Sequence, residues 1–350
     1  MPKKVLFILL VLVLMALAAF WFWPKAETAV VVLDKPQLDA IAEPQQKTVA
    51  QTTDPVQMDQ YQQQELQQSF SLLSQAYAEE LSYPSYSRPL TSADHQLLNP
   101  NQFDTVALPL EGGASASLVL PKYRFSYPEA LVFKLVMTGL SPQHVKAELR
   151  EQQSGKVLAQ ADLTADADAT EWSHQFDATE QWDGAMELVV LFEAQGKTQQ
   201  LQTGLDYSYP VATIIGIGSS SSRGADLVIP VQLEVKKAGM YRLRANLFTE
   251  SKQPLAVLTA EEQLSEGSAK LELRAFKQVL QQQAGPYWLG TFVLELRSAM
   301  PGEANRYGNS KESGFMVDAI NFGQLSDEPF VVSDEEKQRL QFLQQLAGGK

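Results

Sequence analysis

Three closely spaced acidic residues form the chain's one candidate metal site. Asp162, Asp166 and Asp168 stand near one another, with Thr170 and Glu171 just beyond. Carboxylate and hydroxyl oxygens are the ligands that Ca²⁺ prefers, so the segment is a candidate calcium site. It lacks the glycine and the final spaced glutamate of a known calcium loop. An acidic, solvated turn explains the same residues, and both interpretations stay open.

Other residues that often carry catalysis lack the spacing that catalysis needs. His95, His144 and His174 are scattered, and we expect all three to be structural. Gly196-Lys197-Thr198 ends like a phosphate-binding loop but lacks that motif's first glycine. Gly216-Ile217-Gly218 lacks the third glycine of a dinucleotide loop and suits a strand edge or connecting loop. We therefore expect no catalytic residue, no resident metal and no cofactor.

Aromatic and acidic side chains leave two further alternatives. A sugar-stacking platform could be built from Trp172, Trp182, Trp288, Tyr123, Tyr127 and Tyr307. Packing in the core or at the edge of a β-sandwich explains these residues equally well. A pair of carboxylates for glycoside hydrolysis needs only closeness in space, so a hydrolase with unrecognised carboxylates is the third alternative.

The composition restricts the partners. The 350-residue chain has a formal net charge of -13 and a pI near 4.8. The first 25 residues contain three lysines and no acid, so the acidic excess lies entirely beyond them. Such a surface repels phosphate backbones, which argues against nucleic-acid binding. The chain has no cysteine, which excludes disulfides and suits an oxidising compartment.

An apolar run near the N-terminus predicts a transmembrane anchor. From Val5 to Trp23 no residue is charged, and as a helix the run would be about 28 Å long, close to the hydrocarbon core of a bilayer. Lys3 and Lys4 precede it, so the N-terminus is expected in the cytoplasm and the remaining chain outside. We expect a single-pass protein of a bacterial inner membrane with periplasmic domains. Secretion after signal-peptide cleavage near Ala18 is the alternative.

Composition and hydrophobic period divide the chain into six segments. They are a cytoplasmic stub and anchor at 1–25, a flexible linker at 26–55, an amphipathic helix with a Pro-rich extended segment at 56–110, a first β-sandwich at 111–208, a second at 209–326 and a C-terminal helix at 327–350. The linker is rich in Pro, Gln, Thr and Ala and has no sustained period. Four X-Pro pairs predict that 82–109 runs without regular structure.

Two segments are expected to be helical. The first runs from Met58 to Leu81, where apolar residues recur at spacings of four, three, four and four. These residues are Leu66, Phe70, Leu73, Tyr77 and Leu81. The stripe either packs on the first sandwich or binds a partner. In the tail, Ser333 and Glu336 have the spacing of a capping box. The helix that follows is expected to dock its leucines, at positions 340, 343 and 346, on the second sandwich.

Alternation of apolar and polar residues predicts the strands. In the first β-rich region Leu131 to Met137 alternates and 186–192 is apolar except for Glu187, while Ser154-Gly155-Lys156 suits a hairpin turn. In the second, 227–235 and 241–247 alternate strictly, as do 271–273 and 292–296, which is typical of strands with one buried face. A short helix is expected at 276–283.

Residues 226–298 resemble the bacterial Ig-like domains of envelope proteins. The matching pieces are LVIPVQLEVKKAGMYRLRANLF at 227–248, a strand at 270–275 and GPYWLGTFVLEL at 285–296. The resemblance covers about a fifth of the chain and consists of packing and turn signals. It implies an antiparallel sandwich and leaves function open.

The sequence thus predicts a mainly β protein with two tandem Ig-like antiparallel sandwiches, a transmembrane helix and short accessory helices. We expect a non-enzymatic envelope protein, tethered to the membrane, that binds a protein partner. A cell-wall or polysaccharide-binding module is the alternative.

Overall fold

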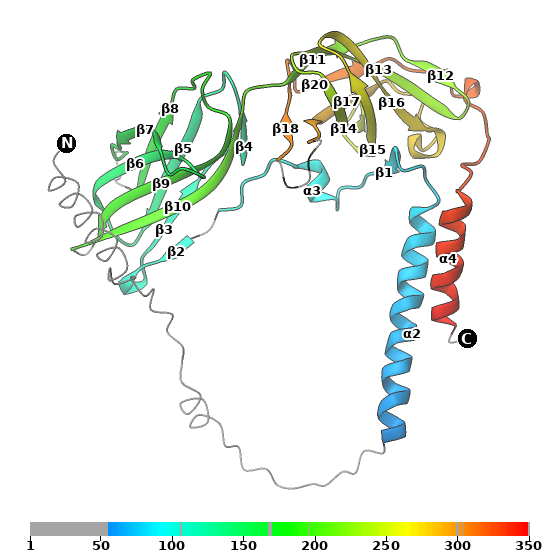
Figure 1. Ribbon diagram of the computed structural model, residues 1–350, viewed down its shortest axis with the longest axis horizontal. Coiled ribbons are helices and arrows are strands. Elements are labelled where there is room, and N and C mark those ends of the chain that lie inside the picture. The colour runs from blue at the N-terminus through cyan, green and yellow to red at the C-terminus, as the bar shows by residue number, and fades with distance from the viewer. Residues whose placement is uncertain are drawn as a thin grey trace, which may run out of the picture. The chain divides into compact units, whose positions relative to one another are not determined.

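The protein is mainly β, and nearly all of its strands pair antiparallel (Figure 1). The computed structural model describes residues 55–105, 107–166, 170–194, 196–298, 300, 302 and 304–348, with the backbone alone for 55–61. The predicted anchor, Val5 to Trp23, and the predicted linker lie outside the described residues. Within the described part, no helix combines the length and the apolar character needed to span a membrane.

The first pair of sheets lies between residues 107 and 208. One sheet has the order β4-β10-β9-β6-β7 and the other β2-β3-β5-β8. The strands are β2 (Ala107–Pro109), β3 (Ser115–Val119), β4 (Arg124–Ser126), β5 (Leu131–Thr138), β6 (Gln143–Glu151), β7 (Val157–Asp162), β8 (Glu171–Phe176), β9 (Gly184–Ala194) and β10 (Lys197–Ser208). The predicted hairpin turn joins β6 to β7, with Gly155 at a φ of 69°, a conformation that favours glycine.

Side chains from both sheets of this pair form one hydrophobic cluster, the first core. The alternation predicted for Leu131 to Met137 is confirmed, since every second residue of β5 is buried. Leu188 and Val190 of the central strand β9 are also fully buried. Trp182 and Tyr207 meet edge to face within the core, with ring centroids 5.3 Å apart.

The second pair of sheets lies mainly between residues 212 and 317. Its sheets have the orders β1-β15-β14-β17-β18, with β20 also on β17, and β12-β13-β11-β19, with β16 also on β13. The strands are β11 (Ala212–Ile217), β12 (Ser221–Arg223), β13 (Asp226–Val235), β14 (Gly239–Thr249), β15 (Pro254–Leu264), β16 (Gly267–Phe276), β17 (Tyr287–Leu296), β18 (Arg306–Tyr307), β19 (Asn309–Ser310) and β20 (Gly314–Val317). The helix expected at 276–283 is a single 3₁₀ turn, η3 (Lys277–Leu280).

Two tyrosines close the second core, the hydrophobic cluster between these sheets. Tyr241 and Tyr287 are fully buried, and each hydroxyl donates a hydrogen bond to the carbonyl oxygen four residues earlier, on Lys237 and Gln283 respectively. This is the geometry of a tyrosine corner, in which a buried phenol ties a strand to the connection before it. The cost of burying each hydroxyl is thereby offset by a hydrogen bond.

The second pair of sheets also includes chain from before the first pair. Strand β1 (Ser87–Pro89) pairs antiparallel with β15, and helix α3 (His95–Leu98) follows it. We call residues 83–98 the strap. Leu90 donates its N–H to the carbonyl of Leu255 at 3.0 Å, and Asn246 donates its side-chain amide to Leu97 at 2.7 Å. The prediction that 82–109 has no regular structure is therefore wrong at β1, α3 and β2. An edge strand tolerates the proline of an X-Pro pair because the missing N–H can face away from the sheet.

Both predicted helices exist. They are α2 (Pro55–Glu80) and α4 (Asp334–Ala347), and α4 begins with the predicted capping box of Ser333 and Glu336. The structure differs in where α4 packs. Its predicted docking leucines are only half-buried, and α4 lies beside α2 in Figure 1. The tail instead contacts the second pair of sheets just before α4, where Phe330 meets Phe276 edge to face.

Candidate functional site

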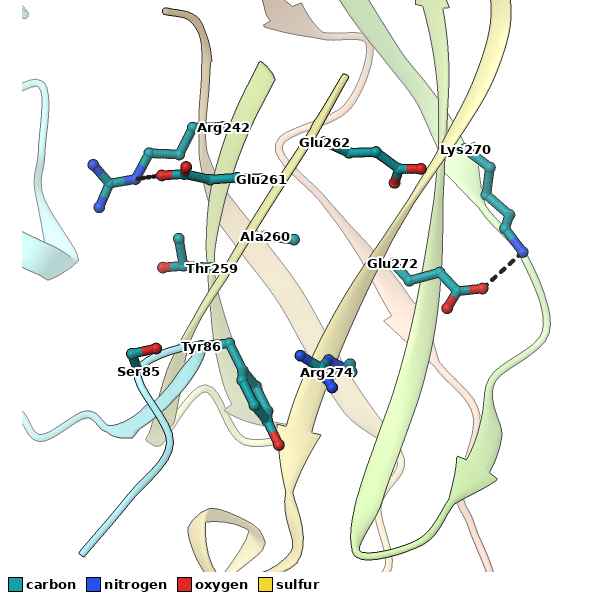
Figure 2. A pocket seen from close by; sticks show the side chains of 10 residues that line it. All are labelled: Ser85, Tyr86, Arg242, Thr259, Ala260, Glu261, Glu262, Lys270, Glu272 and Arg274. Carbon is teal, nitrogen blue, oxygen red and sulfur yellow. Dashed lines mark ion pairs between the residues drawn. The ribbon is translucent and has the colours of Figure 1, made fainter. Parts of the chain in front are cut away.

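A groove of about 690 Å³ lies between β15 and β16, where these two strands separate into the two sheets of the second pair (Figure 2). Strands β15 and β16 are consecutive, but β15 pairs with β14 in one sheet and β16 pairs with β13 in the other. The hairpin between them therefore carries the chain from one sheet to the other and leaves an edge of each sheet facing the groove. The lining residues are Ser85, Tyr86, Arg242, Thr259, Ala260, Glu261, Glu262, Lys270, Glu272 and Arg274.

Strand β1 closes only one end of this opening. It pairs with residues 256–258 of β15, and its Ser87 hydroxyl accepts a hydrogen bond from the N–H of Phe276 on β16 at 3.0 Å. Thr259 adds one more hydrogen bond, from its N–H to the carbonyl of Tyr86 at 2.9 Å. Beyond that point, residues 260–264 of β15 have β14 as their only paired neighbour among the described strands.

Ion pairs neutralise two of the three glutamates that line the groove. Glu261 lies 3.6 Å from Arg242 and 3.2 Å from Arg297. Glu272 lies 2.9 Å from both Lys270 and Arg223. A hydrogen bond from Lys270, and to a smaller extent one from Arg223, holds the pKa of Glu272 below its usual value. The Glu272 carboxylate therefore stays ionised and paired near neutral pH.

Glu262 differs from the other two glutamates. Tyr241 is its neighbour across β14, and the Tyr241 side chain is inside the second core. Directly opposed residues share one face of a sheet, so Glu262 also points to the inner face, toward β16. Figure 2 shows it there, facing Lys270 and Glu272, which pair with each other. Within the described part of the chain Glu262 is exposed and forms no ion pair.

A half-buried cluster around the buried carboxylate of Asp226 closes the groove at the strap. The Tyr86 hydroxyl donates to both carboxylate oxygens of Asp226, at 2.9 Å each. The Arg274 guanidinium covers the Tyr86 ring at 3.9 Å from its centroid and lies 3.6 Å from Asp226. Burial raises the pKa of Asp226, and burial together with the Asp226 hydrogen bond raises the pKa of Tyr86 to about 12. The cluster fixes the strap across both sheets.

The candidate calcium residues lie elsewhere, in the first pair of sheets. Asp162 ends β7 and is exposed, and Asp168 lies outside the described residues. Asp166 accepts hydrogen bonds from the backbone N–H groups of Thr170, at 2.9 Å, and Glu171, at 3.1 Å. Among the described residues no cluster of three His, Cys, Asp or Glu has the geometry to hold a metal ion. Asp166 organises the turn before β8.

The histidines are separated in the structure. His95 begins α3, His144 lies 3.1 Å from Glu193 at the surface, and His174 packs edge to face on Phe176. None of the three lines the groove.

The aromatic residues proposed as a sugar platform are likewise dispersed. Trp172 and Trp182 are buried in the first core. Trp288 carries Lys252 over its ring at 3.0 Å, and Tyr307 carries Arg124 at 4.7 Å. The two tryptophans of the first core are therefore not available to a sugar platform, Tyr127 stacks on Tyr209 with ring centroids 5.3 Å apart, and Tyr123 is exposed. Tyr86, the aromatic residue of the groove, was not among the sequence candidates.

The sequence analysis missed the strand that forms the groove. Strand β15 begins with four consecutive buried residues, 255–258, and continues through Thr-Ala-Glu-Glu-Gln, so it shows no period of two. The apolar run was the available signal, because short apolar runs are typical of fully buried strands. Nothing in the sequence indicates that Tyr86 lies against Asp226, which is 140 residues away.

Comparisons with known proteins assign no family. No family model and no curated protein sequence matches the chain. A DUF4785 family protein from Legionella pneumophila is 17% identical over 52% of this chain and 52% of that chain, with a TM-score of 0.38. An Escherichia coli alpha-2-macroglobulin activated by porcine elastase is 10% identical over 56% of this chain and 20% of that one, with a TM-score of 0.24. Domains from titin are 11% identical over 62% of this chain and 83% of that one, with a TM-score of 0.22. The chain therefore spans about half of the length of the Legionella protein. The TM-scores of all three similarities are too low to define a shared fold.

Proposed function

We propose that this chain is a non-enzymatic, membrane-tethered envelope protein that binds a protein partner at the groove between β15 and β16. The observation that carries the proposal is the half-closed opening between the two sheets. The strap fills one end of it and leaves the other end lined by charged side chains. Exposed strand edges are the usual place where a sheet accepts another chain.

The charges of the groove favour binding over hydrolysis. A general acid needs a carboxyl with a raised pKa next to the substrate. Glu261 and Glu272 instead form ion pairs with cations, and the pKa of Glu272 is lowered by its hydrogen bonds to Lys270 and Arg223. Asp226 has the raised pKa, but both of its oxygens accept from Tyr86, and its side chain is only 11% exposed.

The same geometry argues against stacking of a sugar ring. Arg274 already covers one face of Tyr86, the single aromatic side chain that lines the groove. Polysaccharide binding remains the alternative function, and the test must distinguish it from protein binding.

The rest of the proposal comes from the sequence. The two Ig-like sandwiches are supported by the paired sheets with separate cores, and the second also by its two tyrosine corners. The membrane tether and the periplasmic location are supported by the apolar run from Val5 to Trp23, which Lys3 and Lys4 precede, while the single lysine just after it, Lys25, is followed by Glu27.

Photo-crosslinking in the native cells tests the function. A benzophenone amino acid is placed at Ser85 or Lys270, at the two ends of the groove, and at Lys156 as a control on the exposed turn of the first pair of sheets. The expected result is one discrete protein adduct from both groove positions and none from the control. The proposal is wrong if no adduct forms, or if the control gives the same adduct. Cosedimentation of the full chain with purified peptidoglycan, lost on substitution in the groove, would favour the polysaccharide alternative.

A further inference from the structure

We propose that the partner contributes an extended segment that adds to β15 along residues 260–264, in line with β1, and that a lysine or arginine of this segment pairs with Glu262. The inference rests on the proposed function and specifies it: it names the edge, the backbone groups and the chemistry of the occupant. Three features of the groove support it.

The first feature is the direction of the backbone groups of β15. On the side of β1, Leu255 accepts from Leu90 and Thr259 donates to Tyr86. Backbone groups alternate from one side of a strand to the other with a period of two residues. The register of β15 with β14 is regular from residue 256 to residue 264. The N–H and C=O groups of Glu261 and Gln263 therefore point to the side on which β1 lies, and no described strand pairs with them there.

The second feature is that β1 already shows how a segment fits. It runs antiparallel to β15 and bridges to β16 through Ser87. It cannot continue past Tyr86, because the chain turns back there: the N–H of Ser87 bonds the carbonyl of Pro84 at 2.9 Å. The unfilled stretch of five residues is about 16 Å long at the rise of a β-strand. A second extended segment can occupy it without displacing the strap.

The third feature is the charge. An added strand would turn alternate side chains inward, into the space between β15 and β16. The cations there are engaged, since Lys270 is 2.9 Å from Glu272 and Arg274 lies over Tyr86. Glu262 is the acid of the groove that forms no ion pair with any described residue. A basic side chain at the inward position of the partner segment satisfies it.

The charge also argues against a second copy of this chain as the occupant. Symmetric antiparallel pairing of residues 260–264 with themselves would place Glu262 directly opposite its own copy. Like charges in that position destabilise a pair of strands. A partner with a basic segment is the occupant that the edge fits.

Synthetic peptides test the edge on the full chain. The probe is a seven-residue peptide of alternating Thr and Val with a central Lys, acetylated and amidated, and its matched control has Glu in place of Lys. Residue-resolved hydrogen exchange reports on the amides of Glu261 and Gln263, which should slow, while that of Glu262, bonded within the sheet, should not change. The Lys peptide should bind about two- to fivefold more tightly than the Glu peptide, the range of an exposed ion pair. Glu262→Gln should remove that preference.

A matched pair of variants separates backbone pairing from side-chain contact. Glu261→Pro and Glu261→Ala both remove the ion pairs of Glu261, but only the proline removes the outward N–H. Glu261→Pro should weaken peptide binding about tenfold relative to Glu261→Ala, the effect of one lost hydrogen bond in the pairing. If Glu261→Pro unfolds the protein, Gln263→Pro against Gln263→Ala makes the same comparison.

Each contrary outcome overturns the inference. Unchanged exchange at Glu261 and Gln263 with peptide bound, or equal binding by the two Glu261 variants, refutes pairing at the edge. An oligomer of the full chain in sedimentation that Glu261→Pro dissociates would make a second copy the occupant. The proposed function fails separately, if the groove positions give no specific adduct in cells. A groove adduct without exchange protection leaves the function standing and removes the strand pairing.

Discussion

Tyr86→Phe tests whether the strap stabilises the second core. The substitution removes one hydroxyl that donates to the buried carboxylate of Asp226, at 2.9 Å from each oxygen. A hydrogen bond to a charged group is worth about 1.5–3 kcal/mol, more than a neutral one. The ring stays under Arg274, so packing is retained. We expect the free energy of unfolding to fall by about 2 kcal/mol at neutral pH.

The effect should depend on pH because Asp226 titrates. Burial raises its pKa, so the folded state binds this proton more readily than the unfolded state does. Stability from this group therefore increases as pH falls through the folded pKa, and it is lost as pH rises. Without the Tyr86 hydroxyl the ionised carboxylate loses a donor and the folded pKa rises further. Below that pKa the cost of Tyr86→Phe should shrink to about 1 kcal/mol, the value of a neutral hydrogen bond.

Urea unfolding followed by hydrogen exchange measures the two cores separately. With a slope of about 2 kcal/mol per molar urea, the midpoint for β13 to β17 should fall by about 1 M, while the midpoint for β5 to β9 should not move. Tyr123→Phe is the matched control, because this exposed ring belongs to neither core cluster. An equal loss at neutral and acid pH, or an equal shift of both cores, would refute the reasoning.

Two further predictions concern buried polar groups. Burial raises the pKa of three phenols to about 12, those of Tyr207, Tyr241 and Tyr287, so the folded state favours their protonated form. The free energy of unfolding should therefore fall as pH rises from about 10 to 12. Circular dichroism should report unfolding over the same pH range in which tyrosinate absorbance rises. Asn246→Ala removes a fully buried side-chain amide that donates a hydrogen bond to α3, and the free energy of unfolding should fall by about 1–3 kcal/mol. Hydrogen exchange in residues 90–98 should become faster. Unchanged exchange there would mean that α3 is held by other contacts.

The fold was predictable where one face of a strand is buried and the other face is exposed to solvent. From Val231 to Val235 in β13 and from Tyr241 to Ala245 in β14, the alternation of apolar and polar residues in the sequence is the alternation of buried and more exposed residues in the sheet. The prediction failed where both faces are covered. Residues 255–258 of β15 are all buried, on both faces of the strand, so they carry no period of two. Strand β1 is three residues long and includes Pro89, which local propensity disfavours.

The candidate site was not predictable, for a different reason. Its residues come from the strap, β14, β15 and β16, and their chemistry depends on which of them are paired. The sequence shows that Glu261, Glu262 and Glu272 are acids, but only the register of the strands shows which of them have cations alongside. For Asp162 and Asp166 the sequence suggested a site that the structure does not form. Their spacing suggested a metal site, whereas Asp166 accepts hydrogen bonds from the backbone of its own turn.

The pattern of pairing in the groove is what separates a binding edge from a protected one. Charged side chains keep exposed strand edges from pairing indiscriminately, and this role explains Glu261 and Glu272 with their cations. Glu262 differs in that its side chain faces inward between the two sheets, with no cation in ion-pair range among the described residues. An inward charge at an edge disfavours a strand that brings an apolar or acidic residue to that position, and it accepts one that brings a cation. The backbone beside it also presents two outward N–H groups where β1 has just ended. One extended segment with a basic residue would therefore gain an ion pair with Glu262 and backbone hydrogen bonds along the edge at the same time.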